Sequence, residues 1–126
     1  MRKINKIIIH CSDSDYDYHD DISVINEWHL ARGFKKVGYH FYIRKDGKIQ
    51  IGRALWEKGA HCEDENGDSI GICLGGKYKF TEIQFKNLKT LLYDLMKEYD
   101  LYTTDIYPHC YFDKNKTCPN FDVHNF

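Results

Sequence analysis

An amphipathic helix pattern that begins at Thr81 is the strongest structural signal in the sequence. Thr81 and Gln84 have the spacing of a capping box, and the helical pattern continues to about Asp100. Apolar residues recur at helical spacing along one face of this segment: Phe85, Leu88, Leu91, Leu92, Leu95 and Tyr99. A helix with one apolar face is stable only when that face packs on another element, so we expect a sheet for it to cover.

Short segments with strand character account for most of the remaining chain. Their apolar or alternating residues predict five strands, at residues 6–10, 39–43, 48–51, 69–74 and 105–107. Asp46-Gly47 predicts a tight hairpin turn between the second and third of these strands. A second helix is predicted over residues 22–32, with Asp20 or Asp21 as its N-cap and Gly33 at its end.

The order of these elements predicts one α/β domain over residues 1–126, with a central mixed β-sheet flanked by helices. A chain of 126 residues can bury one core, and no repeat or linker-like tract divides it. The net charge of -1 gives no electrostatic reason to bind nucleic acid or an anionic membrane. No apolar run reaches the ~18 residues of a membrane span. We therefore expect a monomer with neither nucleic acid nor membrane as a partner.

The N-terminus and the cysteines indicate where the chain is made. Arg2, Lys3 and Lys6 are followed by only three isoleucines before His10, which is far short of a signal-peptide core, so we expect synthesis in the cytoplasm. Five cysteines are an odd number without a close pairing motif, which favours reduced thiols or a metal ligand over a disulfide scaffold. Ten tyrosines and two tryptophans favour a surface for polar, ring-shaped or peptide ligands, or alternatively a small core packed with aromatics.

A stretch near the C-terminus combines polar residues with both prolines of the chain. His109, Lys116 and Cys118 lie within ten positions and are bracketed by Pro108 and Pro119. Because little helix or strand pattern runs through this stretch, we predict a loop of fixed shape. Loops on a rigid scaffold often carry metal-binding and catalytic residues.

Three residues are candidate zinc ligands: His10 at the end of the first predicted strand, with His109 and Cys118 in the proline-bracketed stretch. Two histidines, one cysteine and a water would satisfy a catalytic zinc site. A hydrolase with a cysteine nucleophile, either Cys118 or Cys11, would use the same residues. The local signatures of the known thiol proteases do not occur in the sequence.

Short segments that together carry a family resemblance are spread along nearly the whole chain: residues 7–12, 28–29, 32–34, 37–41, 44–47, 52–53, 59–61, Asn66, 69–72, Thr81 with Gln84, His109, and 116–119. In composition and order these segments resemble the zinc-dependent N-acetylmuramoyl-L-alanine amidases (type 2 amidases). That family includes small phage amidases and peptidoglycan recognition proteins. No single segment is specific, but the ordered set is.

The resemblance implies that His10, His109 and Cys118 bind a catalytic zinc ion (Zn2+). It also implies that Tyr39 and Lys116 are the catalytic side chains. The implied reaction is hydrolysis of the amide bond between N-acetylmuramic acid and L-alanine in peptidoglycan.

The resemblance further implies that His61 and Asn66 line the cleft for a peptidoglycan or muropeptide substrate. A bare catalytic domain without an export signal is typical of a phage or prophage endolysin, which reaches the wall after the membrane is permeabilised. Two alternatives stay open: a cytoplasmic amidase that recycles muropeptides, and a non-catalytic peptidoglycan-binding module. Retention of Tyr39, Lys116 and Cys118 favours hydrolysis.

Overall fold

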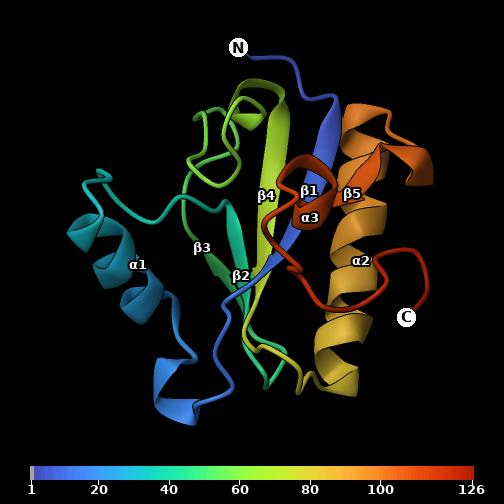
Figure 1. Ribbon diagram of the computed structural model, residues 1–126. Coiled ribbons are helices and arrows are strands. Elements are labelled where there is room, and N and C mark those ends of the chain that lie inside the picture. The colour runs from blue at the N-terminus through green and yellow to red at the C-terminus, as the bar shows by residue number, and fades with distance from the viewer. Residues whose placement is uncertain (1) are drawn as a thin grey trace.

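The computed structural model describes residues 2–126 as an α/β domain built on a five-stranded mixed sheet (Figure 1). The strand order is β3-β2-β4-β1-β5. The two longest strands, β1 (Lys6–Cys11) and β4 (Ser69–Leu74), are parallel neighbours at the centre. β5 (Ile106–Pro108) pairs in parallel with β1, and β2 (Phe41–Ile43) pairs in parallel with β4. β3 (Ile49–Ile51) is the antiparallel edge strand beside β2. The predicted mixed sheet is confirmed.

Three strands begin later than predicted: β3 starts at Ile49, one residue late, and β2 and β5 start late because the residues before them make other hydrogen bonds. β2 starts at Phe41 rather than Tyr39, since the Tyr39 carbonyl accepts from the backbone N–H of Arg53 in a loop. β5 starts at Ile106 because Asp105 ends the 3-10 helix η3 (Thr103–Asp105). β1, in contrast, runs one residue beyond His10, to Cys11.

The two predicted helices are confirmed, together with their caps. α1 (Ile22–Ala31) starts after Asp21, whose side chain accepts from the backbone N–H at the second helical position. α2 (Glu82–Tyr99) starts at the capping box formed by Thr81 and Gln84. Short 3-10 helices, η1 (Asp17–His19) and η2 (Asn66–Asp68), lie in the loops before α1 and β4.

The helices cover opposite faces of the sheet, as Figure 1 shows. Ile7 and Ile9 of β1 belong to the core cluster that contains Leu88 and Leu92 of α2. Successive strand residues point to opposite faces, so His10 faces the α1 side. Its neighbour in the register of β4, Cys73, belongs to the smaller cluster beneath α1.

Candidate active site

A cleft of about 860 Å³ opens on the α1 side of the sheet. Its walls come from α1, from the loop before β4 and from the C-terminal segment. The lining includes most of the predicted site residues: Tyr39, His61, Asn66, His109, Lys116 and Cys118. His10 lies beneath these residues and is 1% exposed.

The predicted zinc ligands meet because of the sheet topology. β1 and β5 are parallel neighbours, so His10 and His109 lie side by side with their ring centroids 4.4 Å apart. The backbone N–H of Cys11 donates to the Cys118 sulfur at 2.9 Å and ties the C-terminal segment to β1. The ligand atoms of His10, His109 and Cys118 all lie within 4.8 Å of one another. A tetrahedral zinc ion requires ligand atoms roughly 3.3–3.6 Å apart, which is comparable with the spacing in this cluster.

The proline-bracketed stretch, predicted to be entirely a loop, contains a one-turn helix α3 (His109–Phe112). Pro108 has extended backbone and is the N-cap of this turn, since its fixed φ suits that position. The backbone N–H of Cys110 then donates to the Cys118 carbonyl at 3.0 Å. This hydrogen bond closes the stretch and brings Cys118 back to the start of α3.

A chain of hydrogen bonds fixes the tautomer of His10. The Ser69 hydroxyl donates to the Glu65 carbonyl at 2.7 Å, so its oxygen accepts from His61 Nε2 at 3.2 Å. His61 Nδ1 is then the acceptor for His10 Nε2–H, at 2.9 Å. The lone pair of His10 Nδ1 is left for a metal ion, which is the usual arrangement when a second residue orients a histidine ligand.

His61 is held in this position by the residues around it. A β-carbon at Gly71 of β4 would lie 2.6 Å from the His61 ring, so only glycine leaves room for the imidazole. The Asn66 side-chain oxygen accepts from the backbone N–H groups of His61 and Cys62, at 2.8 and 3.0 Å. Both ring nitrogens of His61 and the side-chain oxygen of Asn66 thus bond within the protein. Their contact with substrate stays a prediction. A glycine inside a buried strand was the sequence signal for this close approach.

The buried imidazoles are neutral at pH 7. Burial lowers the pKa of His10 well below its ordinary value, and the nearby His61 and His109 lower it further. Burial likewise lowers the pKa of His61, and the nearby His40 lowers it further. Neutral imidazole is the form that binds a metal ion.

The two predicted catalytic side chains flank the ligand cluster. The Tyr39 ring lies 4.9 Å from that of His10. Burial, followed by the Cys73 and Cys118 thiols, raises the pKa of Tyr39 well above its ordinary value, so its hydroxyl keeps its proton. Lys116 is exposed at the cleft, and its charge adds to burial in lowering the pKa of His109.

All five cysteines are free. The Cys11 thiol, together with burial, raises the pKa of Cys118. Metal binding therefore has to displace a proton from Cys118, which makes the affinity dependent on pH. The N–H of Cys11 that points at the sulfur favours the thiolate once it forms.

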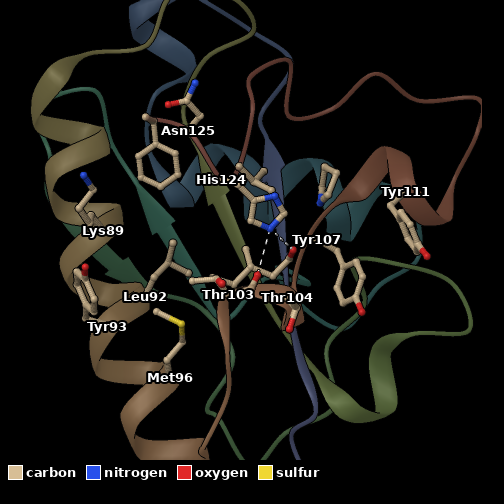
Figure 2. A pocket seen from close by; sticks show the side chains of 14 residues that line it. Lys89, Leu92, Tyr93, Met96, Thr103, Thr104, Tyr107, Tyr111, His124 and Asn125 are labelled. Atoms are coloured by element: carbon tan, nitrogen blue, oxygen red, sulfur yellow. Dashed lines mark hydrogen bonds between the residues drawn. The ribbon is translucent and has the colours of Figure 1, made fainter.

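A second hollow, of about 700 Å³, lies between α2 and the C-terminal residues (Figure 2). Leu92 and Met96 of α2 face Thr103 and His124 across it. The nitrogen Nε2 of His124 lies 3.0 Å from the Ile106 carbonyl. Among the described residues, its lining contains one imidazole and no Cys, Asp or Glu, so it offers no comparable set of metal ligands.

The sheet is mixed and is covered by helices on both faces, and a His-His-Cys cluster lies in a cleft beside one helix. These features define a class of small α/β proteins whose candidate active site is suited to a metal ion. The model of the amidase family described as N-acetylmuramoyl-L-alanine amidase matches residues 1–121. The chain belongs to this family and is a peptidoglycan amidase. The family resemblance in the sequence is confirmed, and it favours a metal-ligand role for Cys118 over a nucleophilic one.

Relatives with known names include phage lysis enzymes. The chain is 33% identical to the endolysin of Enterobacteria phage T3, over 93% of this chain and 81% of that protein. Identity to the endolysin of Escherichia phage T7 is also 33%, with the same coverage. Among solved structures, the N-acetylmuramoyl-L-alanine amidase LysC from Clostridium intestinale URNW superposes with a TM-score of 0.85 at 32% identity, covering 94% of this chain and 77% of that one. Within the described residues, no helix is long and apolar enough to cross a membrane.

Proposed function

We propose that this protein is a zinc-dependent amidase that hydrolyses the bond between N-acetylmuramic acid and L-alanine, and that it acts as a phage or prophage endolysin. The observation that carries the proposal is the cluster of His10, His109 and Cys118, whose ligand atoms lie within 4.8 Å of one another beside an open cleft. Similarity to phage endolysins over 93% of the chain supports the lysis role.

The donor set suits zinc, because two neutral imidazoles and one thiolate leave a fourth tetrahedral position free. Zinc supplies Lewis acidity, which polarises a carbonyl and makes water ionise near neutral pH. His61 and Ser69 hold the His10 ring in the tautomer that presents Nδ1. The backbone N–H of Cys11 orients the Cys118 sulfur.

Two side chains of the cleft act on the substrate in this proposal. The Lys116 ammonium stabilises the negative charge that develops on the amide oxygen during attack, and one such donor is typically worth ~3 kcal/mol. The Tyr39 hydroxyl, which keeps its proton at neutral pH, either orients the attacking water or delivers a proton to the leaving amine.

Metal analysis and lysis assays test the proposal together. Purified protein is expected to contain zinc and to reduce the turbidity of permeabilised bacterial walls, and a chelator should abolish both properties. Cys118→Ser should lose the metal, whereas Cys110→Ser, a change to a half-buried thiol beside the cluster, should keep it. Protein without bound zinc, or lysis that is indifferent to chelator, would sink the proposal.

A further inference from the structure

Four neighbouring aromatic side chains extend from the cleft, and the three outer ones contact one another, since the Tyr16 ring also lies 5.5 Å from that of His19. Trp28 lines the cleft, and the His19 ring meets it edge-on with centroids 5.0 Å apart. The Tyr18 ring lies 4.3 Å from that of His19, and Tyr16 stacks on Tyr18 at 5.3 Å. We call Tyr16, Tyr18, His19 and Trp28 the aromatic row.

The outer rings of the aromatic row are open to solvent. Tyr16 is 63% exposed and Tyr18 is 73% exposed. Single exposed aromatics are ordinary on a protein surface, but adjacent ones that continue a binding cleft indicate a ligand surface. Trp28 belongs both to the cleft and to the row, so a ligand that enters the cleft can extend along the row. We therefore expect the row to bind another part of the same ligand.

The loop that carries the row is fixed at several points. The Ser14 hydroxyl lies 2.7 Å from His19 Nδ1. The Asp15 carboxylate accepts from the consecutive backbone N–H groups of residues 77–79, at 2.8 to 3.4 Å. Asp20 accepts from the backbone of the β2–β3 turn at 2.8 Å. The backbone that carries the rings is therefore fixed before any ligand binds, which removes part of the ordering cost from binding.

The chemistry of the row matches a sugar better than a charged ligand. Tyrosine, histidine and tryptophan each combine a flat apolar face with a polar edge. A pyranose ring likewise has a face of C–H groups and a rim of hydroxyls. The loop that carries the outer rings is rich in aspartate, with Asp15, Asp17 and Asp20 next to them in sequence, which disfavours anionic polymers such as nucleic acid.

We propose that the aromatic row binds the glycan strand of peptidoglycan next to the sugar whose amide is cut, so that the substrate is the polymer rather than a free muropeptide. This inference rests on the proposed amidase function and names its substrate class. The exposed sides of Tyr16 and Tyr18 would contact the sugars outside the cleft, while the cleft itself holds the amide. A polymer preference also separates a wall-lysing enzyme from a recycling one.

The test compares two substrates in the double variant Tyr16→Ala/Tyr18→Ala. Hydrolysis of purified sacculi should fall about tenfold, the usual effect of losing aromatic binding anchors. Hydrolysis of a soluble monomeric muropeptide should stay within about twofold of the unchanged protein. Tyr93→Ala is the matched control, because Tyr93 is a 65% exposed tyrosine on α2, across the sheet.

A binding assay keeps this inference separate from the proposed function. Glycan strands stripped of their stem peptides contain no bond for an amidase to cut, so sedimentation with them measures the aromatic row alone. The unchanged protein and Tyr93→Ala should bind these strands, and the double variant should lose most of that binding. The inference would be overturned by equal losses on sacculi and muropeptide, by unchanged hydrolysis of sacculi, or by no binding to stripped strands. The last two outcomes would point to a protein partner. Failure of the unchanged protein to cut either substrate, with strand binding intact, would refute the amidase proposal alone.

Discussion

At the scale of single residues, the candidate ligand cluster joins side chains from segments far apart in the chain. His10 is separated from His109 and Cys118 by about a hundred positions, so residue spacing alone does not bring them together. The family resemblance names all three, and the pairing of β1 with β5 explains why two of them meet. The role of His61 behind His10 was missed, because a hydrogen bond between two imidazoles depends on the path of the loop before β4. Two glycines, Gly59 in the loop and Gly71 inside its buried strand, are the sequence features that allow this close approach.

Lys116→Ala should separate catalysis from metal binding. The ammonium lies at the cleft but is not a metal ligand, so the variant should keep its zinc content and lose about 10²–10³ in kcat, the typical cost of one oxyanion donor. Lys114→Ala is the matched control, since Lys114 lies over the Tyr111 ring and not in the lining of the cleft. Rates on sacculi, with metal content measured on the same samples, check the prediction. A fully active Lys116→Ala protein would remove Lys116 from the mechanism.

At the scale of elements, the sequence predicts best where local chemistry decides the outcome. The capping box at Thr81 and Gln84 was readable from four residues, and α2 begins where it indicates. The start of β2 was less readable because a hydrogen bond from the distant loop at Arg53 sets it, and the start of β5 because the 3-10 helix before it is only three residues long. The one-turn helix α3 escaped prediction since four residues are too few to show helical periodicity.

Gln84→Ala should destabilise the fold beyond the loss of a cap. The buried side-chain amide of Gln84 donates to the carbonyls of Ile43 and Gly75, at 3.1 and 2.8 Å, and its oxygen accepts from the backbone N–H of Thr81. The variant removes the cap, leaves the buried Gly75 carbonyl without its donor, and leaves the Ile43 carbonyl with only the backbone N–H of Gly75, so we expect a loss of about 2–4 kcal/mol in the free energy of unfolding. Urea denaturation measures it. Lys86→Ala, an exposed site on the same helix, should change stability by less than about 0.5 kcal/mol, and a Gln84→Ala loss no larger than that would contradict the assigned role.

At the scale of the whole molecule, buried imidazoles gather on the α1 side of the sheet. His29 Nδ1 accepts from the backbone N–H of Gly38 at 2.8 Å, and His40 Nδ1 accepts from that of Gly71 at 3.0 Å. Protonation would destroy both acceptors. Composition shows seven histidines but does not say which of them are buried, because that depends on the packing of loops far apart in sequence.

This arrangement predicts acid sensitivity of the fold in metal-free protein. Burial lowers the pKa of His29 and of His40 to about 4, below the ordinary value of about 6.5 that they regain on unfolding. Between pH 6.5 and 4 the unfolded chain binds protons that the folded chain excludes, so stability falls as the pH falls. Each of the two imidazoles contributes up to about 3 kcal/mol to this loss. Urea denaturation at a series of pH values measures the slope.

The window from pH 6.5 to 5 isolates the imidazoles from the carboxylates. Asp15 and Asp21 have pKa values of about 2 in the folded protein, and the stability they provide is lost only below about pH 4. His40→Gln should therefore flatten the pH dependence in this window, even though the variant is less stable at pH 7. His124→Gln, which changes an exposed imidazole, is the matched control. An equal slope in both variants would mean that burial of His40 does not set the acid limit, and that the cleft side of the sheet is held by other groups.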